Sequence, residues 1–203
     1  MENIEQKVIN IARKEVGYLE KKNNDLRYLY EKTQNAGSAN YQKYSYDLRK
    51  AYPDKKIYFP AAWCDYFVDW CFLQAYGVSN LNSLIGGVEG YTPSSAALYK
   101  KHAGAWIENP ALFKPGDQIF FKNSSRICHT GIIIDVIPSS QTIVTIEGNT
   151  GSGDNIVIPN GGCVAQKFYK FNNKRIAGAG RPAYNKLNEM RFIPHWIHIE
   201  STG

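Results

Sequence analysis

Residues 61–77 read AAWCDYFVDWCFLQAYG and follow directly after Pro60. Apolar side chains recur in this stretch at helical spacing and Gly77 closes it, so it predicts a helix with one buried stripe. Cys64 falls in the first turn, where the free N–H groups of a helix favour a thiolate. Taken alone, Cys64 suits a reactive thiol and a buried structural cysteine equally well. Cys71, seven residues on, suits the structural role better.

Two later segments supply the partners that a reactive thiol needs. His129 opens the apolar run HTGIIIDV, which predicts a strand that holds the imidazole at a sheet edge. The next predicted strand, 142–148, contains Glu147, and strand alternation places Asn149 on the same face. One of these two could accept the imidazole N–H while the other organises the surroundings. Taken alone, either residue is most simply a solvent-exposed residue near the end of a strand. The combination with Cys64 and His129 favours a nucleophile–base site.

The remaining pattern predicts helices first and strands afterwards. Helical spacing and caps indicate helices over about 3–15, 41–51 and 92–104, in addition to the one after Pro60. Short β-rich runs broken by Gly, Asn, Ser or Pro predict strands at 118–122, 130–137, 142–148, 156–159, 164–168 and 175–180. This order favours an α+β fold with helices packed on an antiparallel sheet of about six strands.

The polar, Tyr-rich segment 18–60 predicts a long surface excursion. Excursions of this length are usually functional lids or groove walls, and a decorative insertion is the plain alternative. The chain of 203 residues, 43% hydrophobic, has room for one core. We therefore expect a catalytic domain over 1–182 and a tail or linker over 183–203.

The charge pattern narrows the possible partners. The net charge of +6 is scattered along the chain, which argues against a nucleic-acid partner and fits either a polyanionic surface or an ordinary solvated exterior. No window approaches the roughly 18 apolar residues of a membrane span, so we expect no membrane partner. Residues 1–10 lack the apolar core of a signal peptide, so we expect a cytoplasmic protein with four free thiols. We also expect a monomer.

Four blocks of sequence together resemble a known family. WCDYFVDWC at 63–71, GDQIFF at 116–121, HTGI at 129–132 and IEGN at 146–149 resemble, in order, the blocks of CHAP domains, the cysteine, histidine-dependent amidohydrolases/peptidases. The resemblance spans about 3–182. It implies a papain-like α+β fold that cleaves amide bonds of bacterial peptidoglycan. It also implies a role for each candidate: nucleophile for Cys64, base for His129, orientation of the base for Glu147 and a further polar position for Asn149.

The chain departs from the CHAP pattern at two places. Asp65 follows the nucleophile where the family commonly has Ala, and we expect its side chain to point to solvent. Some members carry an Asp-rich calcium loop before the nucleophile, whereas residues 18–60 contain no Asp-x-Asp run. We therefore expect no metal, and the implied reaction needs no cofactor.

Aromatic residues near the predicted helix are candidates for substrate contact. Trp63 adjoins Cys64, and we expect it to line the substrate groove. Tyr66 and Tyr91 could also stack on sugar or peptide, but most of the 14 tyrosines must be ordinary core-edge residues.

The other histidines and cysteines carry weaker patterns. His102 ends a predicted helix, which favours a capping role. His195 and His198 lack the further ligands that a zinc site needs. Cys128 and Cys163 are expected to be small buried side chains.

The expected reaction is acyl transfer, in which a thioester forms on Cys64 and is then hydrolysed. With no signal peptide, a phage endolysin is the expected class. The alternatives are a wall-binding module without activity, an interbacterial effector amidase with an immunity partner, and a hydrolase of other amides. The residues do not distinguish an N-acetylmuramoyl-L-alanine amidase from a peptidoglycan endopeptidase, because groove shape selects the bond.

Overall fold

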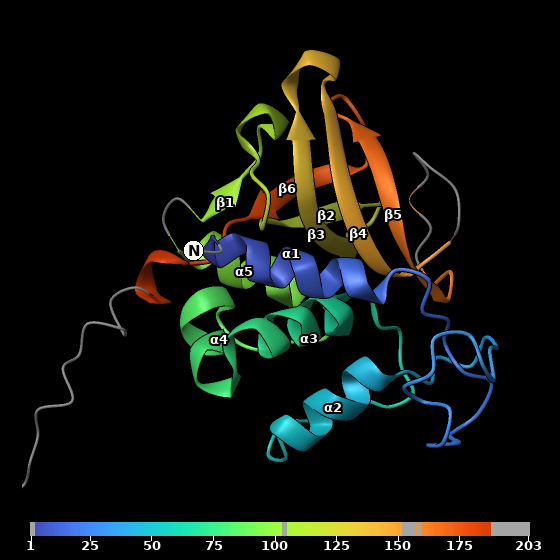
Figure 1. Cartoon of the computed structure of the whole chain (residues 1–203). Helices are drawn as coiled ribbons and strands as arrows, with labels where there is room; N and C mark the ends of the chain where they lie inside the picture. Colours follow the sequence, from blue (N-terminus) through green and yellow to red (C-terminus); the bar gives the residue numbers. More distant parts are fainter. Residues whose placement is uncertain (1–2, 103–104, 152–156, 158–159, 188–203) are drawn as a thin grey trace, which may run out of the picture.

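One sheet forms the framework on which the helices pack (Figure 1). The structure, a computed structural model, describes residues 3–102, 105–151, 157 and 160–187. Within these residues six strands form an antiparallel sheet in the order β1-β6-β2-β3-β4-β5. The helices lie together on one side of it, below the strands in Figure 1. The prediction of an α+β fold with helices on a six-stranded antiparallel sheet is therefore confirmed.

Most of the strands lie where the sequence predicts them. They are β1 (Trp106–Ile107), β2 (Gln118–Lys122), β3 (Ile127–Ile137), β4 (Thr142–Thr150), β5 (Cys163–Lys170) and β6 (Ile176–Gly180). The two-residue β1 was not predicted, because so short a strand leaves no alternating pattern. The predicted strand 156–159 lies outside the described residues except for Val157, which is in no strand.

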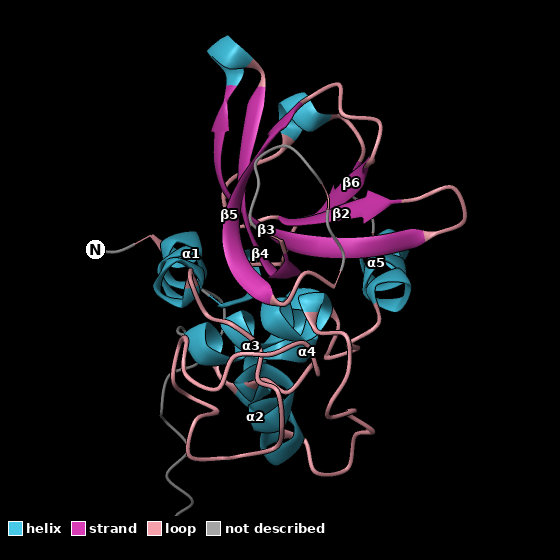
Figure 2. Ribbon diagram, turned by 90° about the vertical axis from the view of Figure 1, so that its right-hand side faces the viewer, coloured by secondary structure: helices cyan, strands magenta, loops and turns pink. Residues whose placement is uncertain are grey.

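The predicted helices are confirmed, and one more is present. They are α1 (Ile4–Glu15), α2 (Lys43–Ala51), α3 (Cys64–Tyr76), α4 (Val78–Ile85) and α5 (Thr92–Lys101). Helix α4 was not predicted, because Gly77 was interpreted as a stop. Gly77 does end α3, at a φ of 78°, but α4 begins at the next residue. Figure 2 shows α3 and α4 below the strands, with α2 farther from the sheet.

The sheet separates two apolar cores. Phe120, Ile132 and Ile146 face the helices and belong to the larger core. The next residues along these strands point the other way, as strand alternation requires, and Phe121 and Ile133 belong to a smaller core on the opposite face.

Helix α3 is buried around its whole circumference at its N-terminal end, instead of along one stripe as predicted. Each residue from Cys64 to Phe72 is buried. One face packs on β4, where a methyl group added at Gly148 would lie 2.4 Å from the Cβ of Phe67. Tyr44 of α2 also packs on the helix, with its ring 5.2 Å from that of Phe67 and 5.1 Å from that of Trp70. Glycine at 148 is therefore what lets the helix approach the sheet this closely.

Segment 18–60 runs over the surface as predicted between residues 22 and 40, most of which are exposed, but it is anchored in the core at several points. Lys21 and Leu29 are fully buried, and the Lys21 ammonium donates hydrogen bonds to the carbonyls of Glu31 and Lys32. An isolated bridge pairs Leu19 with Cys163 of β5. The segment is tied to both the sheet and α3 because its polar groups bond to its own backbone and its aromatic rings enter the core.

The packed domain continues past residue 182. Tyr184 donates a hydrogen bond to the Gly116 carbonyl, and the Ala183 N–H donates to the carbonyl of Leu84 in α4. Tyr184 and Leu187 are both buried. Residues 183–187, predicted to begin a tail, therefore belong to the domain, and the rest of the predicted tail lies outside the described residues.

We predict that Gly148→Ala lowers the free energy of unfolding by about 3 kcal/mol, because the new methyl meets a Cβ that no rotamer change can move. Urea denaturation measures this. Gly17→Ala is the control: nothing lies within 4 Å of the added methyl, and only its φ of +89° is strained, at a cost of about 1 kcal/mol. Equal stability of the two variants would contradict the close contact between α3 and β4.

Candidate active site

The candidate nucleophile lies at the first position of α3. Cys64 is 8% exposed and its thiol is free. Trp63 is the N-cap residue, so the Cys64 N–H is one of the helix groups without an intrahelical acceptor. The Thr92 hydroxyl, at the start of α5, lies 3.8 Å from the Cys64 sulfur. The placement of Cys64 in the first turn is confirmed.

The candidate base lies on β3, where its strand pairs with β2. His129 is fully buried, and its ring packs 6.0 Å from that of Phe121, its partner across the strands. Its Nε2 lies 2.9 Å from Oε2 of Glu147. Nδ1 has no hydrogen-bond partner among the described residues, and with Nε2 occupied it is the nitrogen left for Cys64. The thiol is near enough to act on the ring electrostatically, but lies outside hydrogen-bond geometry.

Glu147 is fully buried and held by partners on three sides. Besides His129, its carboxylate accepts hydrogen bonds from the Thr145 hydroxyl (2.7 Å) and the Tyr169 hydroxyl (3.3 Å). A methyl group added at Gly131 on β3 would lie 2.5 Å from its Cγ, so glycine there leaves room for the carboxylate. The orienting role expected for Glu147 agrees with this geometry, since a fixed carboxylate fixes the imidazole.

The charges of the site act on one another. Burial disfavours the imidazolium and by itself lowers the pKa of His129. The interactions of the ring with Cys64 and Glu147 outweigh burial and raise the pKa of His129 from 6.5 to about 10. Burial, followed by the charge of Glu147, also raises the pKa of Tyr169 far above its usual range, so this phenol stays protonated and remains a donor. The site therefore favours an imidazolium beside the sulfur at neutral pH.

These contacts provide the parts of covalent catalysis by a cysteine. The three residues come from α3, β3 and β4, and each is placed by regular secondary structure rather than by a loop. A thiol at a helix start, a histidine next to it and a carboxylate behind the histidine can serve as nucleophile, base and orienting group. Sequence reasoning found all three.

Asn149 does not join the imidazole. A bulge between Glu147 and Thr150 gives Asn149 a φ of 53° and breaks the alternation on which the prediction of a shared face rested. Its side-chain oxygen accepts from the Gly162 N–H, and its nitrogen donates to Asn160. Asn149 therefore holds the loop at 160–162.

Trp63 is not in a substrate groove, and this expectation was wrong. Its indole is fully buried, stacks 5.3 Å from Tyr44 and donates a hydrogen bond to Glu20 (2.9 Å). Tyr66 is buried as well, at 3% exposed, whereas Tyr91 is 52% exposed. Tyr91 directly precedes Thr92, so of the three aromatics considered it is the one that lies free near the thiol.

Asp65 does not point to solvent, as was expected. It is 1% exposed and accepts hydrogen bonds from the Ser95 hydroxyl (2.6 Å) and the Gln118 side-chain amide (3.0 Å). Burial raises the pKa of Asp65 to about 6, although both hydrogen bonds lower it. Gln118 also donates to the hydroxyl of Thr130, the residue after His129. Sequence reasoning missed this network, because its members are far apart along the chain.

The remaining candidates have structural positions. His102 is the C-cap residue of α5 and Cys71 is fully buried, as expected. Cys128 and Cys163 are only half-buried, because each lies near the end of its strand. His195 and His198 lie outside the described residues.

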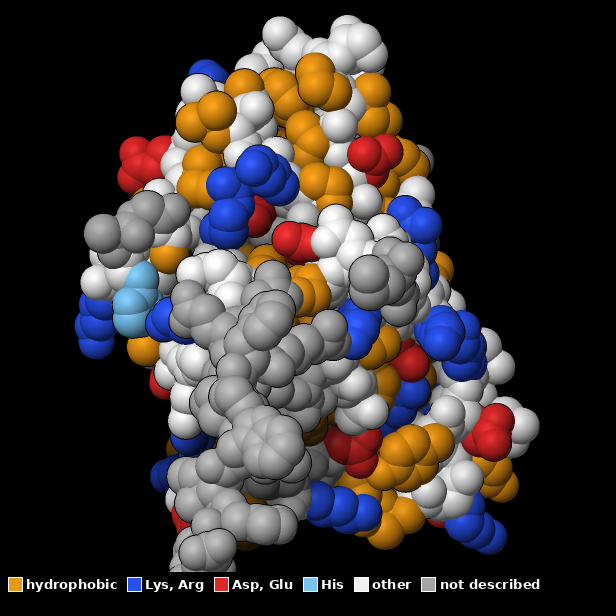
Figure 3. Space-filling model, turned by 60° about the vertical axis from the view of Figure 1, so that its left-hand side comes forward, with side chains coloured by type: hydrophobic (Ala, Val, Ile, Leu, Met, Phe, Trp, Pro, Cys, Tyr) orange, Lys and Arg blue, Asp and Glu red, His pale blue; other side chains and the backbone are white. Residues whose placement is uncertain are grey.

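No candidate metal centre is present in the described part of the chain, where no three His, Cys, Asp or Glu side chains are grouped to hold an ion. In residues 3–102, 105–151 and 160–187, no helix has the length and apolar character required of a membrane span. On the face shown in Figure 3, Lys and Arg side chains are spread among the other types instead of forming one patch.

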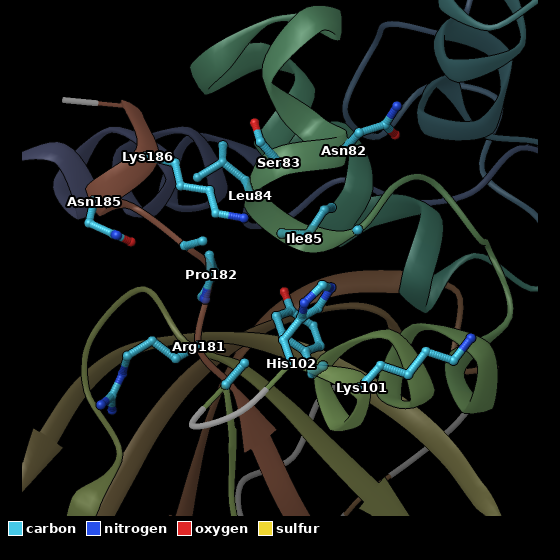
Figure 4. Close-up of a pocket in the computed structure, with 14 residues that line it drawn as sticks. Asn82, Ser83, Leu84, Ile85, Lys101, His102, Arg181, Pro182, Asn185 and Lys186 are labelled. Carbon is cyan, nitrogen blue, oxygen red and sulfur yellow. The ribbon is translucent and has the colours of Figure 1, made fainter. Parts of the chain in front are cut away.

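A cavity of about 480 Å³ lies between the ends of α4 and α5 and residues 181–186, and contains none of the catalytic candidates. Figure 4 shows Lys101 and Arg181 extending to opposite sides of it. Arg181 is held there by a two-point ion pair with Asp117 (2.8 and 2.9 Å). Lys101 and Arg181 therefore do not converge on a common ligand position in this cavity.

No family model and no curated protein matches the chain. Among solved structures, "The crystal structure of Ly7917" is similar to it over 89% of the chain, with 14% sequence identity and a TM-score of 0.41. The chain covers 62% of that structure's own length. At this similarity, only the residues and their geometry bear on function.

We predict that His129 stays protonated through neutral pH, because its pKa is raised to about 10 by Cys64 and Glu147 against the effect of burial. Its ring resonances in a histidine-labelled sample, assigned by comparison with His129→Ala, should not shift between pH 6 and 8. Glu147→Gln removes one negative charge, so the midpoint should move to lower pH. A wild-type midpoint near the ordinary 6.5 would contradict the coupling.

Proposed function

We propose that this chain is a CHAP-type cysteine amidohydrolase or peptidase that cleaves an amide bond of bacterial peptidoglycan. The observation that carries the proposal is the buried set of Cys64, His129 and Glu147, with the imidazole between the thiol and a carboxylate 2.9 Å away. Such a set serves acyl transfer, because it provides an activated sulfur and a proton donor for the leaving group.

The mechanism follows from the positions of the charges. The Cys64 thiolate adds to the amide carbonyl, and the developing oxyanion is stabilised by free N–H groups at the start of α3, that of Cys64 among them. His129, already protonated, gives its Nδ1 proton to the leaving amine. Neutral His129 then takes a proton from water, which attacks the thioester and releases the acid. Glu147 holds the ring in one orientation through both steps.

Peptidoglycan is the proposed substrate because the four sequence blocks that resemble CHAP domains include each of the three catalytic residues. The scissile bond would be either that between muramic acid and L-alanine or one within the peptides. A phage endolysin is the proposed biological class. A wall-binding module would need no nucleophile, base or orienting residue. The presence of all three therefore favours hydrolysis over binding alone.

Tyr91 replaces Trp63 as the proposed substrate-contacting aromatic. Its ring is half exposed, and the Arg126 guanidinium lies 5.6 Å from the ring centroid. The adjoining Thr92 touches the Cys64 sulfur, so a chain bound at the thiol passes close to this ring. Tyrosine rings stack on sugar and peptide planes while keeping the hydroxyl in water.

We predict that Cys64→Ala abolishes clearing of purified Gram-positive peptidoglycan, while Cys163→Ala, which removes a half-buried thiol of β5, retains it. Turbidity measures clearing, and amine labelling with mass spectrometry identifies the new ends. A new L-alanine terminus means an amidase, and a stem or bridge residue means an endopeptidase. Equal clearing by wild type and Cys64→Ala would show that Cys64 is not the nucleophile.

We predict that Tyr91→Ala raises the wall concentration needed for half-maximal rate about tenfold, from the loss of roughly 1.5 kcal/mol of aromatic contact, with little change in the maximal rate. Tyr30→Ala is the matched control, since Tyr30 is 51% exposed but bonds to Asp47 of α2. Initial rates of turbidity loss over a range of wall concentrations measure both constants. An equal effect of the two substitutions would remove Tyr91 from the substrate surface.

A further inference from the structure

We propose that the Thr92 hydroxyl is a further catalytic group, which donates a hydrogen bond to the Cys64 sulfur when that sulfur is a thiolate. This inference rests on the proposed function only in taking Cys64 as the nucleophile. It assigns a residue of α5 to a site otherwise built from α3, β3 and β4.

The contact itself is the first argument. Thr92 Oγ1 lies 3.8 Å from the Cys64 sulfur, and both residues are buried, at 5% and 8% exposed. A buried hydroxyl is normally hydrogen-bonded, and within the described part of the chain the sulfur is the partner of this one. A thiolate has no proton to give, so in the charged state the hydroxyl is the donor.

The helix does not use this hydroxyl for itself. A threonine at a helix start commonly caps the free N–H groups of the first turn. In α5 the N-cap residue is Tyr91, Thr92 is the first helical residue, and no side chain caps the turn. The hydroxyl therefore remains available to the sulfur of α3.

A buried network fixes the position of Thr92. Ser95, three residues on and on the same side of α5, donates to Asp65, the residue after Cys64. Asp65 also accepts from Gln118 of β2, which donates in turn to Thr130, next to His129. The chain neighbours of the nucleophile and of the base are thus joined, and α5 is held against both. Asp65 acts as a positioning residue.

The chemistry requires no bond change at Thr92. The imidazolium and the hydroxyl both stabilise the thiolate before attack. When His129 gives its proton to the leaving amine, its positive charge is lost, but the hydroxyl remains a donor beside the sulfur. The titratable groups of this site are His129, Glu147, which is hydrogen-bonded to His129, and Asp65. Asp69 and Glu89 interact with Asp65 through their charges.

The test is the rate at which iodoacetamide alkylates Cys64, followed on its own peptide by mass spectrometry from pH 5 to 9. The thiolate forms a carbon–sulfur bond and iodide leaves, so the rate reports thiolate without any wall substrate. Thr92→Val keeps the shape and removes the hydroxyl. We expect its half-maximal rate about one pH unit above wild type, which is about tenfold slower labelling at pH values below both midpoints. Thr92→Ser should return to within about twofold.

Ser94→Ala is the matched control, because it removes a hydroxyl from the same turn, and it should label like wild type. Thermal unfolding of each variant separates loss of fold from loss of the donor. A Thr92→Val profile equal to wild type overturns the proposal, and so does a Thr92→Ser profile equal to that of Thr92→Val. If Cys64 of the wild type is not labelled rapidly at low pH, the proposed nucleophile is overturned. This outcome is distinguishable from failure of the Thr92 proposal, because it comes from the wild type alone.

The positioning role has its own test in the same assay. Ser95→Ala removes the link between α5 and Asp65 and should shift the profile by less than Thr92→Val. If the link acts by placing the hydroxyl, the double variant shifts no more than Thr92→Val alone. Additive shifts would show that Asp65 and Ser95 act independently of Thr92.

Discussion

The close approach of α3 to β4 at Gly148 is the constraint on which the rest of the structure depends. With no side chain at 148, the Phe67 ring and the edge of the Trp63 indole come down onto the strand backbone. That distance sets where the start of the helix falls and therefore where the Cys64 sulfur lies relative to His129. It also explains why Trp63 is in the core, since the residue that caps the helix is pressed between β4 and Tyr44.

His129 and Glu147 are both fully buried. Burying an ion pair is costly unless the remaining polar atoms are satisfied, and here Thr145 and Tyr169 satisfy the Glu147 carboxylate. Among the described residues, Nδ1 of the imidazole has no hydrogen-bond partner, and Cys64 is near enough to raise the pKa of the ring. The enclosure thus holds the histidine in one orientation, which is the preorganisation that the proposed reaction requires.

Local patterns in the sequence predicted the elements and the three main side chains, because helix caps, apolar spacing and strand alternation are local. Cys64 begins α3, and His129 and Glu147 lie in β3 and β4, elements that such patterns locate. Trp63 was placed wrongly because segment 18–60 covers it, and Asp65 because α5 and β2 supply its partners. Thr145 could have been found by counting two residues back from Glu147. Tyr169 and Thr92 could not, since only the folded chain brings them near.

The position of β6 in the sheet has a consequence for how the chain acquires its structure. Residues 176–180 insert between β1 and β2, strands made some sixty residues earlier, so the outer edge of β2 stays unpaired until they arrive. The central hairpins β2–β3 and β3–β4 can form during synthesis, because their partners are close in sequence. The sheet is complete only after β6 has been synthesised. Until then the ribosome-bound chain carries an open edge, the feature that chaperones shield and that makes early release prone to aggregation.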